Sequence, residues 1–106
     1  MKIQNNYTRG GYSTQTAEKY IEYKKPLYSL STDLEELVRF IDKKPTDEVI
    51  GYKAWFSQEG LPPFSIKFSK QINLPKYLEI VEIENLTACE VKYNVFFKAD
   101  GLKVVE

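Results

Sequence analysis

The stretch from Ala88 to Val105 constrains the fold of this chain most, because residues of alternate character follow one another along it. The odd-numbered residues from Cys89 to Phe97 are apolar or aromatic, and the even-numbered residues between them are mostly polar. Alternation over this length predicts a half-buried β-strand over residues 88–98. The Asp100-Gly101 pair is typical of a type I′ turn, so a short returning strand is expected after it.

Three further segments show the same strand pattern. Residues 49–56 place apolar side chains at every second position, and residues 64–69 do the same. In residues 78–86 the apolar parity changes in mid-segment, which indicates a bulge or bend of the kind that lets small sheets curl. Residues 18–30 are compatible with a short helix or a strand, and Pro26 favours an edge strand.

One helix is expected, over residues 33–44. Thr32 and Glu35 have the spacing of a capping box, in which each side chain bonds a backbone donor left free at the helix start. A stripe of apolar residues follows at helical spacing, and Pro45 would end the helix. The stripe consists of Leu34, Leu37, Val38 and Ile41.

The chain is long enough for one domain with one core: it has 106 residues, of which 42% are hydrophobic. Residues 1–16 are poor in apolar side chains, so we expect a mobile N-terminal arm followed by a single globular domain over residues 17–106. The fold class is α+β, mostly antiparallel β, either a small barrel or a strongly bent sheet with one packed helix.

Composition argues against several kinds of function. No histidine is present, and the single cysteine lies in a strand pattern, so no catalytic residues, metal site or cofactor are expected. The 15 basic and 15 acidic residues cancel, which is unlike a non-specific binder of duplex DNA. Without a signal peptide or a long apolar span, the chain is expected to be cytoplasmic, with no membrane partner.

The polar side of the sheet offers the best indication of function. Trp55 and Phe96 lie at positions of polar parity, opposite the core. The lysines of the same parity are Lys53, Lys67, Lys92 and Lys98. Aromatic rings among lysines are typical of a single-stranded nucleic acid platform, in which rings stack on bases and ammonium groups bind phosphates. Arg9 and Tyr12 of the arm could join this site, or the arm or the helix could cover the two rings.

The C-terminal half also resembles a known family. The residues that carry the likeness are Ile72 to Pro75, Val81 to Asn85, and Phe97-Lys98-Ala99-Asp100 with Leu102. Residues 48–104 are similar to the small accessory proteins of Gram-positive conjugative elements, a family that includes a helicase processivity factor. The resemblance implies an OB-like barrel and an accessory role on single-stranded DNA in replication or transfer.

Two functions are therefore expected as alternatives. The first is a non-enzymatic accessory of a mobile genetic element (plasmid, conjugative element or phage) that contacts single-stranded nucleic acid, with a helicase, nuclease or other protein as a further partner. The second is a small protein-binding module, an inhibitor or control factor, that acts through an acidic surface. That surface would be the acidic helix 33–44 or the set Glu79, Glu82, Glu84 and Glu90.

Overall fold

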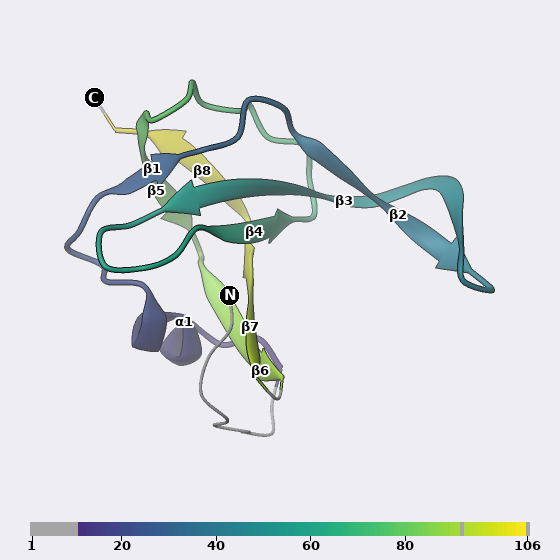
Figure 1. Ribbon diagram of the computed structural model, residues 1–106, viewed down its shortest axis with the longest axis horizontal. Helices are drawn as coiled ribbons and strands as arrows, with labels where there is room; N and C mark the ends of the chain where they lie inside the picture. The colour runs from purple at the N-terminus through teal and green to yellow at the C-terminus, as the bar shows by residue number, and fades with distance from the viewer. Residues whose placement is uncertain (1–10, 92, 106) are drawn as a thin grey trace.

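The computed structural model describes residues 11–91 and 93–105 (Figure 1). Its elements are α1 (Thr14–Tyr20), β1 (Leu27–Ser29), β2 (Glu35–Ile41), β3 (Lys44–Ser57), β4 (Phe64–Phe68), β5 (Ile80–Glu84), β6 (Thr87–Val91), β7 (Asn94–Ala99) and β8 (Gly101–Val104). The fold is α+β and mostly β, as the sequence predicts. The strands form one mixed sheet in the order β6-β7-β4-β3-β1-β5-β8, with β2 paired to β3, and this sheet is not closed into a barrel.

The core lies on one side of β3, β4 and β7. Phe64, Ile66 and Phe68 of β4 are fully buried, as the alternation in this segment predicts. The ring of Phe64 lies 6.5 Å from that of Phe56 in β3 and 5.2 Å from that of Phe97 in β7, measured between centroids. These three strands therefore share one aromatic core, and their opposite side faces outwards.

The predicted strand over residues 88–98 is instead a hairpin. β6 and β7 pair antiparallel, and Val91 is opposite Asn94, so the chain reverses between them. The buried parity in β6 is that of Ala88 and Glu90, whereas Val91 is exposed. In the sequence, apolar residues continue at odd-numbered positions through both strands, so the segment resembles one strand. The buried positions, however, change from even numbers in β6 to odd numbers in β7.

The predicted turn at Asp100-Gly101 is also wrong. The backbone N–H of Asp100 donates to the carbonyl of Glu84, and the chain continues into β8, which pairs with β5. The β5–β8 and β6–β7 ladders have the same antiparallel register, because the two residue numbers of every pair add to one total in both. The two ladders therefore form one long hairpin. Asn85, with φ 53°, lies at the bend between its halves. One half pairs with β4 and the other with β1, which is how the sheet curls.

The predicted helix over residues 33–44 does not form. This segment is β2, a two-residue turn and the start of β3, with Ile41 opposite Lys44. Asp42 and Lys43 have φ values of 51° and 65°, the left-handed geometry that a type I′ turn requires. Pairing along β3 outweighs the helical spacing, because secondary-structure propensity is weak compared with tertiary contacts. The expectation of an acidic helix fails with it.

The helix of this fold lies earlier, at α1, which begins in the last residues of the expected arm and continues into the segment 18–30, where a short helix is one of the two alternatives. Ser13 caps it through its side chain, 3.1 Å from the backbone N–H of Thr16, and also bridges to Ala88 of β6. Ala17 and Ile21 are buried against the sheet. The anchored part of the chain therefore begins no later than Ser13, ahead of the expected boundary at residue 16. The expected mobility of residues 1–10 lies outside the described residues.

β1 is not an edge strand, because it pairs with β3 on one side and with β5 on the other. It is only three residues long and begins directly after Pro26, so the proline takes no ladder position. In the described part of the chain, no helix is long and apolar enough to cross a membrane.

Candidate nucleic-acid interface

Three of the predicted lysines form a row across neighbouring strands. Lys53 of β3 is opposite Lys67 of β4, and Lys67 is opposite Lys98 of β7. Neighbouring strands lie about 4.8 Å apart, and like charges directly opposite each other destabilise a sheet. We call this side of β3, β4 and β7 the outer face, defined by Lys53, Trp55, Lys67, Phe96 and Lys98. The row is the feature of the outer face that folding alone does not favour.

Trp55 and Phe96 lie next to this row. Trp55 is opposite Ser65, and Phe96 precedes Phe97, the partner of Ile66, so both rings flank Ser65. Trp55 is 37% exposed and Phe96 is 49% exposed. They come from strands two positions apart, a separation of about 10 Å. The rings therefore lie open on one surface rather than under the helix, the alternative that the sequence left open.

The indole of Trp55 is held by a carboxylate that the sequence assigned to a helix cap. Its Nε1 donates to Glu35 Oε1 over 3.1 Å, and Lys53 Nζ lies 3.4 Å from Glu35 Oε2. Lys53 Nζ is also 5.5 Å from the centre of the indole ring. Glu35 thus fixes the ring and neutralises Lys53. Once the hairpin was assigned, its position opposite Lys53 could have indicated this role.

The free positive charge of the outer face comes from Lys67 and Lys98. Among the described residues, neither ammonium has a carboxylate within ion-pair distance. The stem of Lys67 crosses β3 at Gly51, where an added Cβ would lie 3.3 Å from Lys67 Cε. Gly51 therefore leaves room for this lysine to lie across the sheet.

Tyr12 joins the outer face as the sequence suggested. The centre of its ring is 5.5 Å from Lys98 Nζ. Burial raises the pKa of its phenol, and the neighbouring Cys89 adds to this through charge and a hydrogen bond. Because Cys89 is opposite Phe96, Tyr12 lies on the same side as the two exposed rings. Arg9 and Lys92, the remaining predicted site residues, lie outside the described residues.

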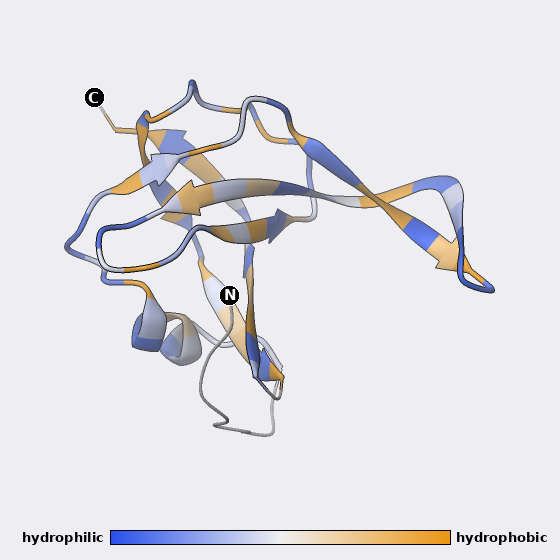
Figure 2. Ribbon diagram, viewed as in Figure 1, coloured by the Kyte–Doolittle hydropathy of each residue, from blue (hydrophilic) through white to orange (hydrophobic). Residues whose placement is uncertain are grey.

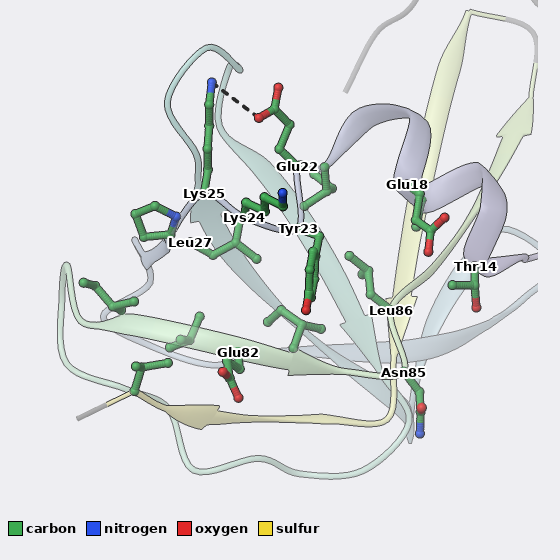
Figure 3. Close-up of a pocket in the computed structure, with 17 residues that line it drawn as sticks. Thr14, Glu18, Glu22, Tyr23, Lys24, Lys25, Leu27, Glu82, Asn85 and Leu86 are labelled. Carbon is green, nitrogen blue, oxygen red and sulfur yellow. Dashed lines mark ion pairs between the residues drawn. The ribbon is translucent and has the colours of Figure 1, made fainter.

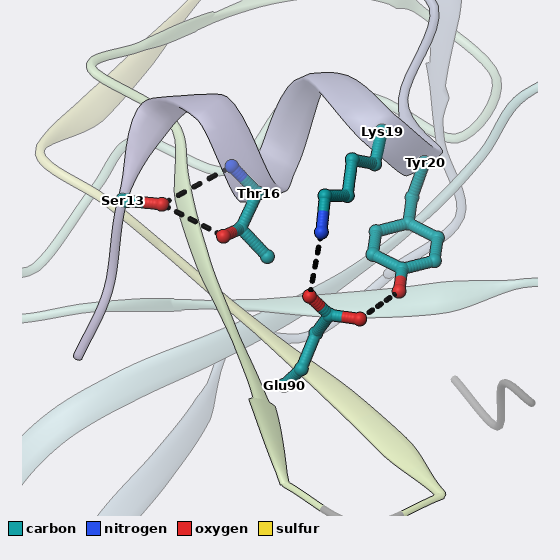
Figure 4. Close-up of polar contacts among 5 residues, drawn as sticks. All are labelled: Ser13, Thr16, Lys19, Tyr20 and Glu90. Carbon is teal, nitrogen blue, oxygen red and sulfur yellow. Dashed lines mark hydrogen bonds and ion pairs between the residues drawn. The ribbon is translucent and has the colours of Figure 1, made fainter. Parts of the chain in front are cut away.

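One member of the predicted acidic set, Glu90, does not lie on the surface with the others. Glu79 accepts from the backbone N–H of Lys76, and Glu82 lies 3.6 Å from Lys103. Glu90 is buried: Lys19 Nζ and the Tyr20 hydroxyl, both from α1, donate to it over 3.1 and 2.5 Å (Figure 4). This carboxylate therefore attaches α1 to β6 and is not offered to a partner.

The contact with Glu90 leads to a prediction about alkaline pH. Burial, then the hydrogen bond and charge of Glu90, raise the pKa of Tyr20 from 10.0 to about 12. A raised pKa in the folded state means that this stabilisation is complete below pH 10 and is lost as the pH rises towards 12. Denaturant unfolding of the wild type should show a steeper loss of stability over this range than Tyr20→Phe does. Tyr23→Phe, at an exposed position, is the control. Equal slopes for the wild type and Tyr20→Phe would contradict the assignment.

A cavity of about 650 Å³ lies elsewhere, between α1, the segment after it and β5 (Figure 3). Ile21, Leu27 and Val81 give it an apolar floor. Its rim is mixed in charge, and Glu22 and Lys25, three positions apart in the segment after α1, form an ion pair at one side of it over 3.8 Å. Of the described residues predicted to contact nucleic acid, none lines this cavity, so it is separate from the outer face.

Comparisons with known proteins add no relative. No family model matches the chain, and neither a curated protein nor a solved structure matches it. The likeness of residues 48–104 to conjugative-element accessory proteins therefore stays an expectation from the sequence. Within the described ranges, no group of three or more acidic or cysteine side chains is placed to hold a metal ion.

Proposed function

We propose that the outer face binds single-stranded nucleic acid without catalysing a reaction. The observation that carries this proposal is the row of Lys53, Lys67 and Lys98 on three adjacent strands. Because Glu35 neutralises Lys53, the repulsion in this row is that between Lys67 and Lys98, which lie opposite each other on β4 and β7. This repulsion costs stability in the free protein, and an anion that lies along the row removes it. Local features that oppose folding are expected where a protein binds a ligand.

The rings beside the row define the kind of anion. Trp55 and Phe96 are exposed on either side of Ser65, and Tyr12 lies near Lys98. A ligand with both phosphates and flat faces can use the lysines and the rings together, and single-stranded nucleic acid has both. Duplex nucleic acid keeps its bases stacked inside, so it can use only the lysines.

The wider role belongs to the same proposal. A non-enzymatic accessory of replication or transfer in a plasmid, conjugative element or phage is what the resemblance of residues 48–104 implies, including an OB-like architecture. The bend at Asn85, which lets one hairpin pair with both β4 and β1, supports a strongly curled sheet of that kind. The acidic protein-binding alternative loses Glu90, which is buried, and the acidic helix 33–44, which does not form.

Titration of a labelled oligo-dT by fluorescence anisotropy tests this proposal. Binding should weaken steeply as salt rises, because each phosphate contact releases counterions and contributes about 0.7 to the logarithmic slope for a single strand. Lys67→Ala and Lys98→Ala should each flatten this slope by about that amount.

Lys103→Ala is the matched control, because Lys103 lies on β8 and pairs with Glu82, away from the outer face. This variant should keep the wild-type slope. An absence of oligo-dT binding at low salt would refute the proposal, and so would equal slopes for all four proteins.

A further inference from the structure

The far half of the β2–β3 hairpin projects from the body of the protein (Figure 1). β4 pairs with β3 only from Tyr52 onwards, and β2 pairs with β3 alone. Residues 38–50 are therefore a two-stranded ribbon with no third strand beside it in the described structure. A two-stranded ribbon is marginally stable in water by itself, so it benefits from a partner surface.

One side of this ribbon is apolar. Val38 is opposite Val49 and Phe40 is opposite Pro45, with one shift in register between these pairs and another between Leu37 and Val38. Val38 and Phe40 are two positions apart in β2, so their side chains and those of their partners lie on one side of the ribbon. Phe40 is 64% exposed and Val49 is 38% exposed. The same side of β2 carries Glu36 opposite Tyr52, and it continues the core side of β3 beyond the body. Figure 2 shows the apolar segments, in orange, along the projecting hairpin.

Charge is distributed unevenly along the hairpin. Its base, next to the body, carries Glu35 and Glu36 at the start of β2 and one basic residue, Lys53 of β3, and Asp33 lies just before β2. At its turn, Lys43 and Lys44 outnumber Asp42. In an antiparallel arrangement of two hairpins, the acidic base of each lies against the basic turn of the other. The hairpin is thus electrostatically complementary to a second copy of itself.

We propose that a second copy of this chain packs on the apolar side of the hairpin, with the two hairpins antiparallel. The contact covers Phe40 and Val49 of each copy. It also places the acidic base of each hairpin against the basic turn of the other copy's hairpin. A nucleic acid fits this ribbon poorly, because residues 38–50 carry three basic and three acidic side chains and are neutral. The interface is small, so the dimer is weak and in exchange with the monomer.

Sedimentation velocity over a concentration series up to about 0.5 mM tests the dimer, since small interfaces support only weak association. The mean mass should rise from monomer towards dimer. Phe40→Ala should raise the dimer dissociation constant about tenfold or more, because it removes a ring that becomes buried only in the dimer. Tyr23→Ala, at a fully exposed position away from the hairpin, should leave it unchanged.

Charge reversal identifies the partner and its direction. The double variant Lys43→Glu with Lys44→Glu should be monomeric, and so should the double variant Asp33→Lys with Glu36→Lys. Mixed together, the two variants should form a heterodimer, because each acidic end then faces a basic one. Persistent monomer for the wild type would overturn the proposal, as would a mixture that stays monomeric while the wild type dimerises. Dimerisation that appears only when oligo-dT is added would assign the contact to nucleic acid instead.

Discussion

Phe64→Ala should destabilise the protein by about 3–5 kcal/mol, the cost of deleting a fully buried ring and leaving a cavity. Phe64 is 0% exposed and lies between Phe56 and Phe97, so its loss removes contacts to two other strands. Chemical denaturation with a two-state fit measures this change. A loss below about 1 kcal/mol, the size of effect typical of surface sites, would mean that the aromatic core is not packed as described.

Leu37→Ala is the matched comparison. The helix expected over residues 33–44 would place Leu37 in the core, where this change costs about 2–5 kcal/mol. In the structure Leu37 is a partly exposed residue of β2 opposite Gly51, so we expect a cost of about 1 kcal/mol or less. A loss as large as that of Phe64→Ala would favour the docked helix instead.

Trp55→Ala and Phe96→Ala should each weaken binding to single-stranded DNA by about 1–3 kcal/mol, the range for loss of one base-stacking ring. Both rings are partly exposed and lie on the side opposite the core, so both variants should still show a cooperative melting transition. Fluorescence anisotropy with the same labelled oligo-dT gives the affinity, and a thermal melt gives the stability.

Tyr77→Ala is the control, because Tyr77 is an aromatic residue that is 60% exposed and lies outside the strands of the outer face. It should bind as the wild type does. If Trp55→Ala abolishes the melting transition, the ring belongs to the core. If all three variants bind equally, stacking on the outer face is excluded.

The sequence predicts the strands that alternate cleanly and form part of the core. Phe64, Ile66 and Phe68 are buried as their spacing requires, and Trp55 and Phe96 lie on the side opposite the core. These outcomes follow from the two-residue repeat of a strand, which depends on no distant partner. Lys53, Lys67 and Lys98 share a face, because each lies opposite the core in its own strand and the three strands are neighbours.

Distant contacts decide where the sequence fails. Glu90 is buried because Lys19 and Tyr20, about 70 positions away, donate to it, and no local pattern contains that information. The segment around Leu37 fits a helix and a strand almost equally well, and pairing with β3 decides between them. A turn at Asp42-Lys43 lacks the glycine that usually marks a type I′ hairpin, so it gave no signal.

Intrinsic fluorescence tests the central claim most directly, because Trp55 is the single tryptophan of the chain. Its indole lies on the outer face, fixed by Glu35 and beside the lysine row. Titration with unlabelled oligo-dT at low salt should quench this emission in a saturable way, as a base stacks on the ring, and added salt should restore it. Emission that stays unchanged while anisotropy reports binding, or no binding by either method, would contradict the proposed interface.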